Sequence, residues 1–195
     1  MGSFNIKIEK CNFPFRGFKE RNGSCSGFSK HYSVAFVNEV DDVFSFEGEL
    51  AQNFLDFYKK DIKKLCLEKI QPPLSKGSCV FIEDYPNIIH VVTNQQGGET
   101  DFKTLCYVVK NSLLLAESNY INIVYMPLIG SFNGKMSKDD CAFTILEQLQ
   151  DIFFNANFKQ LCQVILVARN DKEYEVIEKY YTKLFGGNKN AKNDP

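Results

Sequence analysis

Apolar and polar residues follow two different spacings along this chain, and the order of the spacings predicts strands and helices in alternation. Every second residue is apolar over 4–9, which is typical of a strand. Apolar runs bounded by turn residues predict further strands at 32–37, 79–82, 88–92, 121–126 and 161–167. Apolar residues spaced three and four apart predict helices over 48–70, 100–118, 137–154 and 172–185.

The last third of the chain runs helix, strand, helix, strand, helix, and this order predicts an α/β fold. Helices that connect the strands of one sheet need both of its faces, so we expect a three-layer α/β/α arrangement around a mixed sheet. The segments 79–82 and 88–92 are close enough to form a hairpin. The length of 195 residues predicts a single domain over 1–185, with an irregular insertion loop at 14–30 and a disordered polar tail at 186–195.

Three strand ends carry polar or small residues where open α/β sheets bind ligands, outside the carboxyl edge. They are Asn38, the turn Gly130-Ser131, and Ala168 followed by Arg169. The turn leads into a helix whose start is marked by Ser137 and Asp140, a pair that resembles a capping box. Backbone N–H groups and the helix dipole favour an anion at such a turn, so we interpret this edge as a candidate phosphate site.

Composition and charge narrow the function classes. Lys and Arg number 23 against 24 Asp and Glu, for a net charge of −1, so no overall positive field attracts nucleic acid or an anionic membrane. No apolar run approaches the roughly 18 residues that a membrane helix needs. The 7 cysteines are scattered without a CxxC pair, which predicts free, mostly buried thiols and no metal site. We therefore expect an intracellular protein, cytoplasmic or nuclear, with no cofactor and no membrane partner.

Several blocks of the sequence, in order, resemble those of the macro domain family. In the second half they are NIIHVVT at 87–93, the helix that holds Asn111-Ser112-Leu113 and Ala116, and IVYMPLIGS at 123–131. The final strand and helix, VILVARNDKEYEVIEKYYTKLF, and the first-half segments IKIEKCNF, SVAFVNEVDD and FEGELAQNF also match, so the resemblance runs from Phe4 to Phe185. It implies a macro-domain sheet and a site for ADP-ribose.

The resemblance assigns the two ends of an ADP-ribose ligand to particular residues of this chain. Asn12, with Phe13 beside it, stands where family members have an aspartate that binds adenine, and Ala168 is expected near the same ring. An amide oxygen accepts the same hydrogen bond without the help of a charge. Asn38 matches the first asparagine of the family's strand motif, near which the distal ribose is expected. The second asparagine falls on or beside Asp41.

The first of two glycine turns that would hold the diphosphate has lost most of its glycines. The family's three glycines are replaced by Phe46 or Glu47, Gly48 and Glu49, and Leu50 follows as a further candidate ligand contact. A carboxylate beside the path of a phosphate repels it by about 1 kcal/mol in a partly buried setting. The aspartate that some hydrolytic members carry after this turn aligns with Ala51. The resemblance therefore implies ligand binding without that acid or base.

The second turn keeps Gly130-Ser131 and then continues as Phe132-Asn133-Gly134. Phenylalanine allows a less close backbone approach than glycine, although its ring can stack on a base or a ribose. A related subgroup, the terminal ADP-ribose glycohydrolases, uses a lysine and an aspartate at places that hold Asn94, or a neighbour, and Gly134 here. Neither group is retained, so we assign no catalytic residue.

Three functions follow from the resemblance. The leading one is a non-catalytic module that binds ADP-ribose or a related nucleotide, free or on a protein or nucleic acid. The second is a binding-dead scaffold that contacts a protein or nucleic acid through the 14–30 loop; a solvated insertion explains the same loop. The loop carries aromatic and basic residues: Phe15, Phe18, Phe28, Arg16, Lys19, Arg21 and Lys30. The third is a diverged ADP-ribosyl hydrolase that uses Glu49, Asp41 or Asp42, although loop carboxylates are ordinarily solvated charges.

Overall fold

A six-stranded mixed sheet forms the centre of the computed structural model, which describes residues 4–11, 33–58, 61–84 and 86–186. The strand order is β1-β6-β5-β2-β4-β3. The strands are β1 (Asn5–Lys10), β2 (Val34–Asp41), β3 (Cys79–Ile82), β4 (Asn87–Asn94), β5 (Ile123–Pro127) and β6 (Gln163–Ala168). Neighbouring strands are parallel except for β3, which pairs antiparallel with β4. The predicted mixed sheet and hairpin are confirmed.

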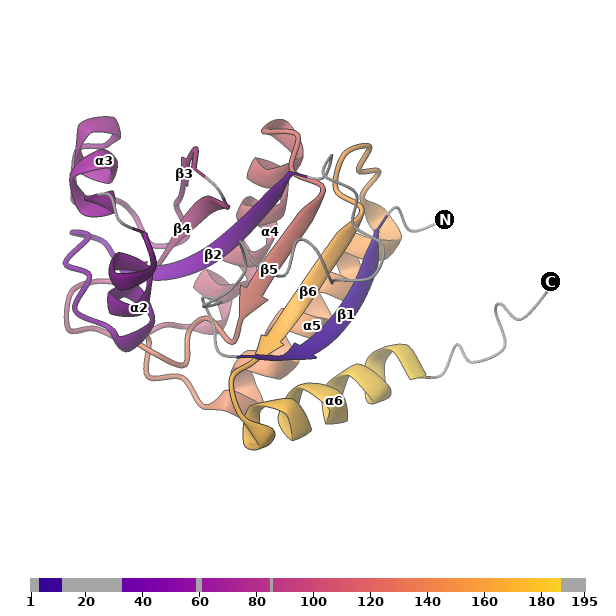
Figure 1. Ribbon diagram of the computed structural model, residues 1–195. Helices are drawn as coiled ribbons and strands as arrows, with labels where there is room; N and C mark the ends of the chain where they lie inside the picture. Colours follow the sequence, from indigo (N-terminus) through magenta and orange to yellow (C-terminus); the bar gives the residue numbers. More distant parts are fainter. Residues whose placement is uncertain (1–3, 12–32, 59–60, 85, 187–195) are drawn as a thin grey trace.

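Helices cover both faces of the sheet, as predicted (Figure 1). On one face lie α4 (Phe102–Ser118), α5 (Lys138–Asn155) and α6 (Asp171–Phe185), and on the other lie α2 (Glu49–Phe57) and α3 (Ile62–Lys69). The predicted single helix over 48–70 is wrong. The backbone is extended at Tyr58, where α2 ends, and a second helix, α3, begins after its N-cap Asp61. The Asp61 side chain accepts the Lys64 amide and so caps α3.

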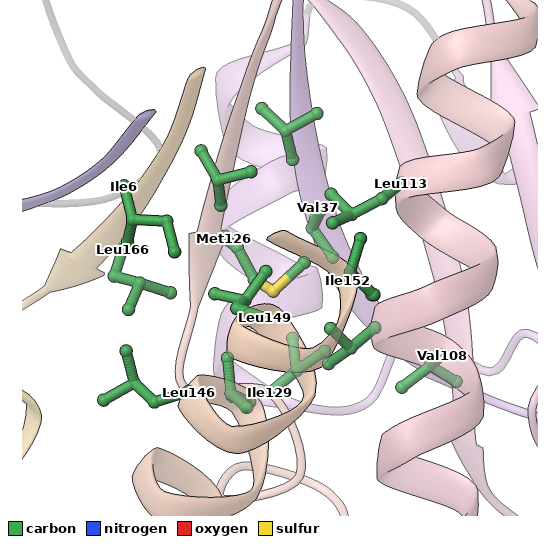
Figure 2. Packing of buried hydrophobic residues seen from close by; sticks show 14 of the residues in the cluster. Ile6, Val37, Val108, Leu113, Met126, Ile129, Leu146, Leu149, Ile152 and Leu166 are labelled. Carbon is green, nitrogen blue, oxygen red and sulfur yellow. The ribbon is translucent and has the colours of Figure 1, made fainter. Parts of the chain in front are cut away.

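The larger core lies between the sheet and α4, α5 and α6 (Figure 2). Val37 and Met126 of the sheet meet Leu113 of α4 and Leu149 of α5, and all four are 0% exposed. Burying a side chain of this size contributes about 1.5–3 kcal/mol. The spacing of three and four that predicted the helices therefore marks the faces that stabilise the fold.

The smaller core, beneath α2 and α3, is rich in aromatic rings. Phe36 of β2 contacts Phe54 of α2 edge to face, with ring centres 6.4 Å apart. His90 of β4 is also buried there at 0% exposure, which confirms its interpretation as a packed strand residue. Burial is less complete for the thiols. Of the six described cysteines, Cys66 and Cys141 are buried, whereas Cys162 is exposed, contrary to its place in an apolar run.

Helix starts follow the predicted capping pattern. The Ser137 side chain accepts the Asp140 amide at 3.1 Å, and its hydroxyl lies 2.7 Å from the Asp140 carboxylate. Within the described ranges, no helix is long and apolar enough to cross a membrane. The predicted 14–30 loop and the tail from 187 onward lie outside the described residues.

Candidate functional site

The strands β2, β5 and β6 are parallel neighbours, so their carboxyl ends meet at one edge of the sheet, which we call the rim. The two predicted glycine turns touch there. A Cβ added at Gly48 would lie 1.8 Å from Oδ1 of Asn133, which means that the start of α2 and the loop after β5 are in direct contact. Asn12 and Phe13, the predicted adenine contacts, lie outside the described residues.

Arg169, the first residue after β6, joins three elements at the rim. Its guanidinium carbon lies 4.1 Å from the centre of the Phe132 ring. One guanidinium nitrogen is 3.1 Å from Oε1 of Glu49 at the start of α2, and the other is 3.1 Å from Oε1 of Glu173. The Glu49 side chain is 72% exposed. The predicted site residues Glu49 and Phe132 are therefore brought together by an arginine that the sequence analysis noted only as the end of a strand.

Glu173 of α6 holds this arginine in place. Its carboxylate is fully buried, accepts the Arg169 amide at 2.9 Å and pairs with Nζ of Lys138 at 2.9 Å. Burial alone would raise the pKa of Glu173, but the hydrogen bonds from Arg169 and Lys138 outweigh it and hold that pKa below its ordinary value. Glu173 is a charged anchor whose oxygens are already occupied.

A second buried carboxylate, Glu39 of β2, lies behind the loop after β5. Its side chain is 0% exposed. Oε2 accepts the Gly130 amide at 2.7 Å, and Oε1 accepts the Gly134 amide at 2.9 Å. The hydroxyl of Thr93 lies 3.0 Å from Oε1. Burial raises the pKa of Glu39, although these hydrogen bonds act in the opposite direction.

The loop after β5, residues 128–134, is closely held around that carboxylate. Gly130 has a φ of 90°, a conformation that glycine adopts at low cost. The Gly134 carbonyl accepts the Thr100 amide at 2.8 Å, and a Cβ added at Gly134 would lie 1.9 Å from the Thr100 hydroxyl oxygen. The predicted phosphate loop is therefore at the rim, but two of its amides bind the protein's own side chain.

Four other predicted residues have their side chains engaged inside the protein. Asn38, Leu50 and Ala168 are at most 1% exposed, and the Ser131 hydroxyl donates to a loop carbonyl at 2.6 Å. The Asn38 amide nitrogen is 3.0 Å from Nδ1 of His90, whose pKa is lowered to about 3 by burial. These residues support the rim from within.

Aromatic rings fill the turn before α2, where the resemblance placed a glycine-rich stretch. Phe44 and Phe46 are at most 1% exposed and have φ values of 55° and 60°. Positive φ is unfavourable for bulky residues, so the burial of both rings must offset it. Their ring centres lie 6.0 and 5.4 Å from that of His90. This turn is shaped by packing and not by glycine.

The carboxylates of the hydrolase hypothesis face different partners. Asp41 accepts the Ser45 amide at 2.9 Å, and Asp42 accepts the Gln96 amide at 2.9 Å. Glu49 pairs with the arginine after β6. Each of the three carboxylates is therefore bonded to a different group of the protein.

Glu39 and Arg169 are the rim residues whose roles the sequence analysis missed. A signal was present for Glu39, because an acidic residue inside the apolar run VAFVNEV is unusual and charged residues are rarely buried without partners. Its partners, Gly130 and Gly134, follow more than 90 positions later, as the separations of 91 and 95 show. No local pattern connects them.

Comparisons with known proteins agree with the fold. The family model of the macro domain matches residues 37–145. The chain is similar to the Oceanobacillus iheyensis macrodomain with MES bound, at 13% identity and a TM-score of 0.73, over 95% of this chain and 94% of that one. It is also similar to the same macrodomain with ADP, at 16% identity and a TM-score of 0.68, over 80% and 86%. For the Trypanosoma brucei macrodomain in complex with ADP-ribose, the identity is 16% and the TM-score 0.64, over 74% and 62%. No curated protein matches the sequence.

Proposed function

The chain belongs to the macro domain family, and we propose that it is a non-catalytic module that binds ADP-ribose or a related nucleotide at the rim. One observation supports this above the others. Helix α2 begins after Gly48 with no side-chain cap, and Gly48 faces Asn133 of the loop after β5. Uncapped amides at a helix start are donors for a phosphate.

The groups that cover this position are ones that a ligand can displace. Asn133 is half-buried, and its side chain is the group that occupies the space in front of Gly48. The bond between Arg169 and Glu49 is an ion pair with a carboxylate that is 72% exposed, and such pairs contribute about 0–1 kcal/mol. A phosphate that replaces Glu49 would gain a charge-assisted hydrogen bond from the guanidinium nitrogen that Glu49 releases.

The carboxylates support a binding role without catalysis. Glu39 and Glu173 are buried, and their oxygens bind amides and side chains of the protein. Asp41 is engaged with Ser45. A general acid or base must reach the reacting bond of the substrate, whereas Glu39 and Glu173 are buried and bonded within the protein.

A scaffold without nucleotide binding is the second candidate, and Glu39 is the observation that favours it. The amides of Gly130 and Gly134 are already satisfied, and the rings of Phe44 and Phe46 fill the first turn. A protein with this rim could use the macro fold to contact a protein or nucleic acid instead.

Titration with ADP-ribose separates the two candidates. A ligand at 100 times its dissociation constant adds about 2.7 kcal/mol to the free energy of unfolding, so the thermal midpoint of the wild-type protein should rise. Gly48→Val should abolish the rise, because its side chain would enter the space in front of α2. Gly186→Val, at the far end of α6, is the matched control and should keep the rise. No rise at millimolar ADP-ribose would overturn the binding proposal in favour of the scaffold.

A further inference from the structure

Glu39 occupies backbone donors that an external anion would otherwise use. The Gly130 and Gly134 amides converge on its two carboxyl oxygens, at 2.7 and 2.9 Å. Converging N–H groups in a glycine-containing loop are a common anion site. Here a side chain of the same chain fills that site, and with 0% exposure it is separated from solvent.

The two amides stay occupied whether or not Glu39 carries a proton. The Thr93 hydroxyl lies 3.0 Å from Glu39 and 2.9 Å from Oδ1 of Asn94. It can donate to the ionised carboxylate, or accept from the protonated form and donate to Asn94. In both states the carboxyl oxygens accept from the loop, so the site does not depend on the charge of Glu39.

With Glu39 in place, the loop cannot turn these amides outward at low cost. Rotation of either amide would break its bond to Glu39 and leave a buried carboxyl oxygen with one partner fewer. The Gly130 and Gly134 amides therefore face inward because Glu39 accepts them.

We propose that Glu39 determines ligand specificity: by filling the loop after β5, it weakens the binding of a second phosphate, so that a nucleotide with one phosphate group binds at least as tightly as ADP-ribose. The inference rests on the proposed function. One phosphate has partners at the uncapped start of α2 and at Arg169 beside it. The second phosphate of ADP or ADP-ribose would reach the loop after β5, whose inward amides Glu39 already holds.

The test measures AMP, ADP and ADP-ribose binding to the wild-type protein, E39Q and E39A by calorimetry. E39Q frees one amide, because a side-chain NH₂ group cannot accept a hydrogen bond, and E39A frees both. The wild-type protein should bind AMP at least as tightly as ADP-ribose. Affinity for ADP and ADP-ribose should rise at least tenfold in E39A and less in E39Q, while AMP affinity changes less than threefold.

E117Q is the matched control. Glu117 also binds consecutive backbone amides, those of residues 159–161 at 2.7–3.1 Å, but at the opposite end of β6. Its replacement should leave the ratio of the AMP and ADP-ribose affinities unchanged. Formate provides a second readout, because it can fill the space that E39A opens and should raise the thermal midpoint of E39A but not of the wild-type protein. If E39A does not fold, E39Q carries the test.

The outcomes separate this inference from the proposed function. Wild-type protein that binds ADP-ribose tenfold more tightly than AMP would overturn the role of Glu39 and leave nucleotide binding intact. If the Glu39 variants bind ADP-ribose and the wild-type protein binds none of the three nucleotides, the role of Glu39 is supported and nucleotide binding by the natural chain is excluded. Folded variants that bind none of the three nucleotides would overturn both.

Discussion

The rim has a buried half and an exposed half. Both contain a glutamate carboxylate that accepts hydrogen bonds, but the two halves differ in how easily those bonds can be broken. In the buried half, Glu39 is 0% exposed and holds the Gly130 and Gly134 amides at 2.7 and 2.9 Å. In the exposed half, Arg169 reaches Glu49, whose side chain is 72% exposed, at 3.1 Å. Bonds closed off from water cost much to break, whereas bonds at the surface exchange with water at little cost. We therefore expect the buried half to hold the fold and the exposed half to admit a ligand.

The largest expected effect contrasts two glycines, one in each half. In Gly134→Val, the new Cβ would lie 1.9 Å from the Thr100 hydroxyl oxygen and 2.7 Å from the Gly130 carbonyl oxygen, which cannot move freely. We expect a loss of about 4 kcal/mol or more in the free energy of unfolding, measured by urea denaturation.

In the paired variant, Gly48→Val, the three atoms nearest to the new Cβ all belong to the side-chain amide of Asn133, which can rotate away. Its loss should stay below about 1 kcal/mol, and Asn133→Ala should relieve what remains. Equal losses in the free energy of unfolding for Gly134→Val and Gly48→Val would contradict the division of the rim into a buried half and an exposed half.

The second contrast compares the two acids that bind Arg169. Glu173→Gln removes the charge from a fully buried group that pairs with both Arg169 and Lys138. We expect a loss of about 3 kcal/mol in the free energy of unfolding, because a buried cation would lose its partner. The loss should shrink in a Glu173→Gln and Arg169→Leu double variant, and a double-mutant cycle measures this coupling.

The third prediction concerns the pH dependence of stability that follows from the buried His90, which contacts Asn38 inside the protein. Burial lowers the pKa of His90 to about 3, so the unfolded chain binds a proton below about pH 6.5 and the folded protein does not. The free energy of unfolding is therefore unaffected by His90 above about pH 6.5 and decreases as the pH falls below it, because protonation favours the unfolded chain. Between neutral pH and pH 5, we expect a loss of about 2 kcal/mol in the wild-type protein. His90→Phe should show a flatter dependence in urea unfolding over this range, and an identical slope would exclude a buried neutral histidine.

The smallest effect is expected for Glu49→Gln in the exposed half. The Glu49 side chain is 72% exposed and Arg169 keeps Glu173 as a partner, so the free energy of unfolding should change by less than about 0.5 kcal/mol. Nucleotide affinity should rise at the same time, because a negative charge beside the phosphate path is removed. A large loss of stability would mean that Glu49 belongs to the fold and not to the binding surface.

Sequence patterns were reliable where their cause is local. Apolar spacings, together with apolar runs bounded by turn residues, predicted the described strands and all but one of the helices to within a few positions, and Ser137 predicted the start of α5. The exception is the helix over 48–70. Its apolar spacing continues through the break at Tyr58 and Asp61, because both α2 and α3 bury residues against the same core. Periodicity reports which face is buried and not whether the backbone is continuous.

Part of the predicted site forms one cluster in the structure, and its role in ligand binding stays a prediction. Gly48, Glu49, Phe132 and Asn133 do meet at the rim. Their geometry depends on Arg169, which stacks on Phe132 and forms an ion pair with Glu49. That arginine was visible in the sequence only as the residue after a strand, since neither contact has a local spacing.

The sequence by itself determined the order of the elements, the layers on both faces of the sheet and the rim where polar strand ends collect. These follow from short-range periodicity and from the rules that connect strands and helices. Only the tertiary structure decided that the loop after β5 closes on Glu39. Residues 39, 130 and 134 become neighbours through the pairing of β2 with β5. Whether a backbone amide faces a ligand or a buried carboxylate is set by that packing, because a residue's type does not specify the direction of its N–H group.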